Sequence, residues 1–78
     1  MTNQDKRLLI EQAAKLVSLG LTVEKERSSL RKLVERGVPY SDPRMMQAYE
    51  RFARVDNEWK HLEVEHLRRR KNLGIDLF

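Results

Sequence analysis

The chain has 78 residues, with 16 Lys or Arg, 12 Asp or Glu, a net charge of +4 and no cysteine. A chain this short makes one small domain, and without a disulfide or a thiolate-bound metal we expect it to gain burial from a partner chain. No basic segment followed by an apolar run opens the sequence, and no apolar run approaches the roughly 20 residues of a membrane span. These features predict a soluble, cytoplasmic protein with no membrane partner.

The first predicted helix covers about residues 4–36. Apolar residues recur there at heptad intervals, and others fill the intervening three- and four-residue steps: Leu9, Leu16, Val23 and Leu30, then Ala13, Leu19, Leu33 and Val34. This spacing is typical of an amphipathic helix, and no stretch alternates with the period of a strand. The remainder is rich in helix-forming residues.

Gly20 leaves two interpretations of this segment. It could end one helix, with Thr22 capping the next and two glutamates in the first turn. Alternatively, one helix runs through it at a cost of about 1 kcal/mol and uses the absent side chain to let another helix approach closely. Because the heptad phase continues across Gly20, the continuous helix is favoured.

Residues 37–42 are predicted to form a loop between two helices. Gly37 suits the left-handed residue just past a helix end, and Pro39 keeps Val38 out of helical geometry. Ser41 or Asp42 then caps a new helix with Pro43 at its first position, where a missing N–H costs nothing. So short a connection returns the chain antiparallel to itself.

The second predicted helix covers about residues 43–71, followed by a short tail at 72–78. Its stripe has the same period: Met45, Tyr49, Phe52, Val55 or Asp56, Trp59, Leu62 and His66. Antiparallel pairing places Trp59 against the segment from Leu16 to Gly20. The predicted fold is an all-α antiparallel helical hairpin. Because one hairpin leaves both apolar stripes partly exposed to solvent, two hairpins should associate into a four-helix bundle dimer.

Two Glu-x-x-His spacings occur in the second helix, Glu58/His61 and Glu63/His66. This spacing occurs in di-metal carboxylate bundles. The two pairs are five residues apart, about 140° around the helix, so both cannot face one interior. A solvated helix face is therefore favoured, and no metal site is predicted.

Two charged features suggest other roles. The run Arg68, Arg69, Arg70 and Lys71 could contact nucleic-acid phosphates, or it could simply complement the negative end of its helix. Arg27 interrupts the first stripe, with Asp56 available across the pair, and a polar pair of this kind usually fixes register.

The loop tip carries Val38 and Tyr40. Connecting loops are often only bends, but an aromatic residue at a hairpin tip is a natural contact for a partner protein. Val38 and Tyr40 are therefore the predicted partner-binding residues.

Catalysis finds no support in the sequence. There is no cysteine, the serines lie far from both histidines, and three scattered glycines cannot form a phosphate-binding loop. We expect no enzyme, no cofactor and no small-molecule substrate. The sequence predicts a self-associating protein–protein interaction module, such as a small regulator, adaptor or chaperone-like subunit. The alternative is a nucleic-acid-binding accessory protein that uses the basic end.

Overall fold

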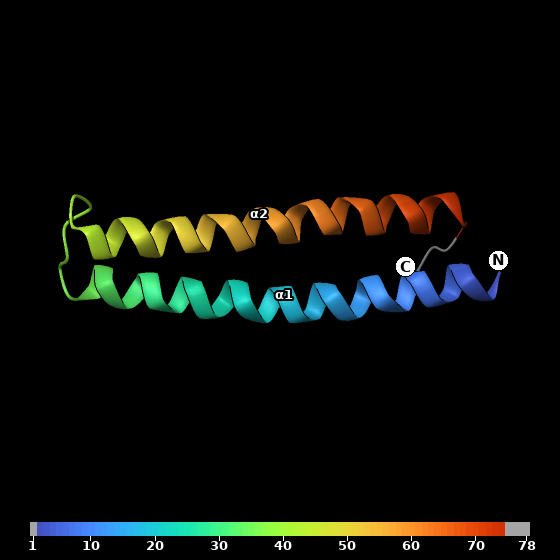
Figure 1. Cartoon of the computed structure of the whole chain (residues 1–78), viewed down its shortest axis with the longest axis horizontal. Coiled ribbons are helices and arrows are strands. Elements are labelled where there is room, and N and C mark those ends of the chain that lie inside the picture. The colour runs from blue at the N-terminus through green and yellow to red at the C-terminus, as the bar shows by residue number, and fades with distance from the viewer. Residues whose placement is uncertain (1, 75–78) are drawn as a thin grey trace.

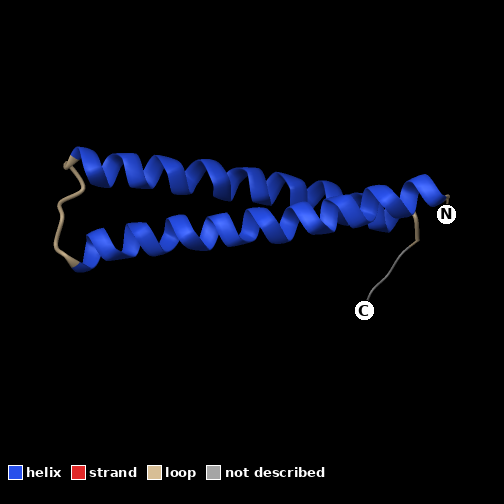
Figure 2. Ribbon diagram, turned by 60° about the horizontal axis from the view of Figure 1, so that its bottom comes forward, coloured by secondary structure: helices blue, strands red, loops and turns tan. Residues whose placement is uncertain are grey.

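The computed structural model describes residues 2–74 and shows two long helices lying antiparallel (Figures 1 and 2). Helix α1 spans Asn3–Glu35 and helix α2 spans Pro43–Asn72, and the molecule measures 52 × 22 × 15 Å. The described residues contain no strand. The predicted all-α hairpin is confirmed. Of the predicted tail, only Leu73 and Gly74 follow α2 within the described residues.

A capping box that the sequence analysis did not single out begins α1. The Thr2 hydroxyl accepts a hydrogen bond from the Asp5 backbone N–H at 3.1 Å, and the Thr2 backbone N–H donates to the Asp5 carboxylate at 3.2 Å. The two residues thereby satisfy two backbone donors that have no partner inside the helix. The Thr2 hydroxyl also donates to the Asp5 carboxylate at 2.8 Å, and this bond, followed by the one from the Thr2 backbone N–H, holds the pKa of Asp5 below its usual range.

Helix α1 runs unbroken through Gly20, as the heptad phase predicted. Thr22 does not cap a new helix, and its hydroxyl instead donates to the Ser18 carbonyl one turn earlier, at 3.2 Å. A Cβ at position 20 would lie 3.4 Å from the indole nitrogen of Trp59. The Trp59 ring therefore lies beside the backbone of α1 at Gly20, where a Cβ would make an ordinary van der Waals contact with it.

The loop confirms the predicted stop and start signals. Gly37 has φ +74°, and the N–H groups of Gly37 and Val38 donate to the carbonyls of Val34 and Leu33, in the Schellman arrangement. Asp42, and not Ser41, caps α2, because its carboxylate accepts from the Arg44 N–H at 2.8 Å. Pro43 occupies the first helical position.

The two helices meet along a seam with strictly alternating three- and four-residue steps. Only Val23, Met45 and Ala48 are buried among the described residues, and the rest of the seam is half-buried. The half-buried residues are Leu9, Gln12, Leu16, Leu19, Glu26, Leu30 and Leu33 in α1, and Phe52, Val55, Trp59, Leu62, His66 and Arg69 in α2.

Three residues of the predicted stripes lie outside this seam. Ala13, Val34 and Tyr49 are exposed, because each sits next to the seam and not in it. Ala48 takes the place expected for Tyr49. The seam is therefore thinner than the predicted stripes, and aromatic and aliphatic surface remains beside it.

Trp59 sets the register of the hairpin. Its indole N–H donates to the Leu16 carbonyl at 3.0 Å, which joins the two helices near their midpoint. The expected position of Trp59, against the segment from Leu16 to Gly20, is confirmed.

Candidate interaction surfaces

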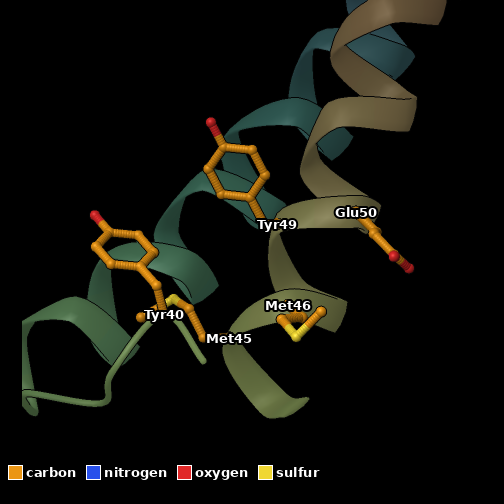
Figure 3. Close-up of a pocket in the computed structure, with 5 residues that line it drawn as sticks. All are labelled: Tyr40, Met45, Met46, Tyr49 and Glu50. Atoms are coloured by element: carbon orange, nitrogen blue, oxygen red, sulfur yellow. The ribbon is translucent and has the colours of Figure 1, made fainter. Parts of the chain in front are cut away.

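The predicted loop contacts differ in exposure. Tyr40 is 71% exposed, whereas Val38 is half-buried. Tyr40 also lines an open hollow of about 400 Å³ together with Met45, Met46, Tyr49 and Glu50 (Figure 3). The loop thus contributes an aromatic ring to a surface whose other residues come from the first turns of α2.

The basic run at the end of α2 does not form one patch. Successive helical residues point about 100° apart, and the structure leaves Arg68 and Lys71 exposed while Arg69 and Arg70 are half-buried toward α1. The Nε of Arg70 is buried without a hydrogen-bond partner. These four cations therefore cannot all contact one linear ligand.

The Glu-x-x-His residues point in several directions. Glu58 and His61 are exposed, and His66 is half-buried with its Nδ1 3.1 Å from the side-chain oxygen of Gln12. Within residues 2–74 no three acidic or histidine side chains gather as a metal site would need.

The expected pair between Arg27 and Asp56 is wrong. Arg27 is exposed, forms an ion pair with Glu24 of its own helix, and lies over the Phe52 ring at 5.7 Å from the centroid. Asp56 binds Lys60 at 2.8 Å. The prediction failed because Glu26, one residue earlier, holds the seam position.

The charged contact between the helices is made by Glu26 and Arg51, at 3.3 Å. The Glu26 side chain is only 19% exposed, whereas the Arg51 side chain is 54% exposed. This contact places Glu26 of α1 beside the third turn of α2.

The seam becomes polar toward the chain termini. Asp5, Gln12, His66 and Arg69 occupy seam positions there in place of apolar residues. Desolvation, followed by the nearby charges of Arg70 and Arg69, lowers the pKa of His66 below its usual range. This end of the hairpin is consequently held together less by apolar burial than the loop end.

One side of the hairpin is basic. Lys25, Ser29, Lys32 and Arg36 follow one another at three- and four-residue steps on α1, as do Arg44, Gln47, Arg51 and Arg54 on α2. Six of these eight residues line one hollow between the helices, together with Leu33: Ser29, Lys32, Arg36, Arg44, Gln47 and Arg51. We call the eight residues the basic flank.

The opposite side of the hairpin carries the exposed apolar residues. Since the two rows of the basic flank meet on one side of the seam, residues on the other side of each helix share the other flank. Six side chains that are about half exposed or more lie there: Ile10, Val17, Val34, Met46, Tyr49 and Leu67. We call these six residues the apolar flank. Leu21 and Val64 are exposed on the back of each helix beside it.

Neither flank was identified from the sequence, although both leave a signal in it. The basic flank is a row of polar and basic residues at three- and four-residue steps on each helix, displaced around the helix from the seam. Each residue of the apolar flank directly follows a seam residue, but charged residues such as Glu24, Arg27 and Arg31 interrupt its rows. Which rows of α1 and α2 share a side depends on how the helices pack.

Comparison with known proteins gives no match: no protein family, no curated protein and no solved structure is similar to the chain. In the described part of the chain, neither helix is long and apolar enough to cross a membrane. The fold and site define a helical hairpin with one basic and one apolar flank.

Proposed function

We propose that the chain is a non-enzymatic protein–protein interaction module that self-associates through its apolar flank. Such a module would serve as a small regulator, adaptor or chaperone-like subunit. One observation carries the proposal. Three hydrophobic side chains are buried among the described residues, while nine large ones are about half exposed or more, eight of them on the apolar flank or beside it.

Self-association would increase the apolar surface that each helix buries. A two-helix seam gives each helix only one covered face, so a hairpin of this length gains little apolar stabilisation on its own. Packing two apolar flanks face to face would give each helix a second covered face, which is the arrangement of a four-helix bundle. The apolar residues of the flank share the helical face next to the seam, where charged residues such as Arg27 and Lys60 separate the two ends of the flank.

The loop end is suited to a further protein partner. Tyr40, the ninth exposed residue, lies with Met46 and Tyr49 around the hollow of Figure 3. Tyrosine and methionine are enriched at the centres of protein interfaces, and methionine adapts its shape to a partner surface. Tyr40 and Val38 remain the residues proposed to contact that partner.

Sedimentation over a range of micromolar concentrations tests self-association. We expect the wild-type chain to sediment as a dimer or larger species. A variant with Ile10→Gln, Val17→Gln and Met46→Gln should shift to monomer, because these changes replace exposed apolar contacts with an amide while keeping reasonable helix propensity.

A matched variant on the other side of the helices controls for the number of substitutions. Lys15→Gln, Ser18→Gln and Arg54→Gln change three exposed residues that lie away from the apolar flank. This variant should remain associated. A wild-type chain that is monomeric at every concentration, and that unfolds cooperatively, would contradict the proposal.

A further inference from the structure

The basic flank concentrates positive charge at the loop half of the hairpin. Its six cations are Lys25, Lys32, Arg36, Arg44, Arg51 and Arg54, and none of its eight positions is acidic. Arg44 pairs with Asp42 at 3.1 Å and Arg51 with Glu26 at 3.3 Å. Within the described residues the other four cations have no ion-pair partner. Each row extends about 15 Å along its helix.

The two rows form one surface and not two separate ones. The hollow between them is lined from α1 by Ser29, Lys32 and Arg36 and from α2 by Arg44, Gln47 and Arg51. A hydroxyl and an amide thus lie among guanidinium and ammonium groups. This mixture of side chains is the one that contacts phosphate oxygens in protein–nucleic acid complexes.

We propose that the basic flank binds the phosphate backbone of double-stranded nucleic acid without reading its sequence. The flank carries no aromatic side chain, and aromatic side chains are the usual stacking platforms of proteins that bind single strands. Its cations come from the sides of two long helices lying next to each other. They therefore present an extended strip of charge of the kind that complements a duplex backbone.

An acidic protein surface fits this flank less well. Protein interfaces have an apolar, aromatic-rich centre inside a polar rim. Among the residues that the structure describes, the large exposed hydrophobic side chains belong to the apolar flank, the helix backs and the loop, and none belongs to the basic flank. Because the basic flank lacks a large exposed hydrophobic side chain, it suits the phosphate backbone of a nucleic acid better than a protein surface.

This binding site also differs from the one expected from the sequence. The predicted contact was the run from Arg68 to Lys71, whose side chains diverge around α2. The basic flank instead draws its charge from residues far apart in the chain. It does not overlap the apolar flank, so duplex binding and self-association are separable properties.

Fluorescence anisotropy with a labelled duplex of arbitrary sequence tests the proposal, using the full chain at several salt concentrations. We expect binding at low salt, with a log–log salt slope of roughly −3 for three or four phosphate contacts. A variant with Lys25→Gln, Lys32→Gln and Arg36→Gln should lose about tenfold or more in affinity and show a shallower slope. A second duplex of unrelated sequence should bind equally well.

The control variant carries Lys6→Gln, Arg31→Gln and Lys71→Gln, three exposed cations outside the basic flank. Both variants have the same net charge, and circular dichroism melting verifies that both are folded. The control should keep affinity within about threefold of wild type. Equal losses in the two variants would overturn the proposal, because the charge of the whole molecule would then account for binding.

Two further outcomes would overturn it. One is the absence of wild-type binding at low salt. The other is a competition result: polyglutamate displaces the labelled duplex as effectively as unlabelled duplex does at equal charge concentration. That result would make the partner an acidic polypeptide. Sedimentation of the same variants separates this proposal from self-association, since the basic-flank variant should lose duplex binding while its assembly is unchanged.

Discussion

At the scale of single residues, Trp59 joins the helices both by packing and by a hydrogen bond. Its ring lies on the backbone at Gly20, and its N–H donates to the Leu16 carbonyl at 3.0 Å. A partly buried tryptophan usually needs such a partner for its polar nitrogen. This one contact combines apolar packing with a directional bond, so it defines how the helices align.

Replacing Trp59 tests that role. Trp59→Ala should lower the free energy of unfolding by about 3 kcal/mol or more, since large-to-small changes of aromatic core residues cost about 3–5 kcal/mol. Trp59→Phe should cost less, because it keeps a ring while losing the hydrogen bond. Urea denaturation followed by circular dichroism measures both. Wild-type stability in Trp59→Ala would mean that the ring does not pack against α1.

His66 is the second residue whose environment leads to a prediction. Burial and the neighbouring Arg70 and Arg69 lower its pKa in the folded state. The unfolded chain, with a histidine pKa of about 6.5, therefore binds more protons than the folded chain just below that pH. Stability should be complete above about pH 6.5 and should fall as the pH drops below it.

Measuring the melting temperature between about pH 7 and pH 5 tests this dependence. This pH range lies above the usual titration of aspartate. Asp5 and Asp42 have lowered pKa values, so their contributions are lost only at more acidic pH. His66→Gln keeps a polar group near Gln12 but does not titrate, and should flatten the profile. An unchanged slope in His66→Gln would assign the pH dependence to another group.

At the scale of elements, the loop works as a helix stop followed by a helix start. Gly37 supplies the left-handed residue at φ +74°, and Asp42 caps α2. No atom lies within 4 Å of a Cβ built at Gly37, so space does not restrict that position. Its requirement for glycine comes from the backbone conformation alone.

Gly37→Val should therefore destabilise the hairpin by on the order of 1 kcal/mol or more, because β-branched residues resist positive φ. Gly37→Asn should cost less, since asparagine tolerates this conformation. The control is Tyr40→Ala, which changes an exposed residue of the same loop and should alter stability by no more than about 0.5 kcal/mol. Thermal melts compare the three. A Tyr40→Ala chain that melts early would place the tyrosine in the core.

At the scale of the whole molecule, the two flanks divide the surface by chemistry. Within the described residues, the large exposed hydrophobic side chains of the helices lie on one side of the seam and on the adjoining helix backs, whereas the basic flank, with six cations and no acidic residue at its eight positions, lies on the other side. If apolar flanks pair, the basic flanks remain on the outside of the assembly. Self-association would then leave two separate surfaces free to bind a polyanion.

Association linked to folding makes stability depend on protein concentration. We expect the melting temperature to rise as concentration increases across the micromolar range, because a folded dimer is favoured by mass action over unfolded chains. The variant with Ile10→Gln, Val17→Gln and Met46→Gln should melt lower and lose this dependence. A wild-type melting temperature that is constant over this range would argue for an independently stable monomer.

Local signals in the sequence were enough to predict both helices and the loop between them. Heptad spacing favoured continuity through Gly20, and Gly37 and Pro43 marked the helix ends, because caps and breakers act within a few residues of the chain. The sequence left Ser41 and Asp42 as alternative caps, and the structure shows Asp42 in that role. The position of Trp59 also followed, since a short loop fixes the antiparallel register. The Thr2 and Asp5 capping box could have been predicted from its spacing as well.

Tertiary packing alone decided which neighbouring residue faces the seam and which faces solvent. Adjacent helical positions differ by about 100°, so the rotation of each helix about its axis decides whether Glu26 or Arg27, and whether Ala48 or Tyr49, faces the seam. The composition of each flank depends on the same rotation, because a flank combines rows from two helices that are far apart in sequence. Periodicity identifies the rows on each helix, but only the packed hairpin brings Lys32 and Arg36 beside Arg44 and Arg51.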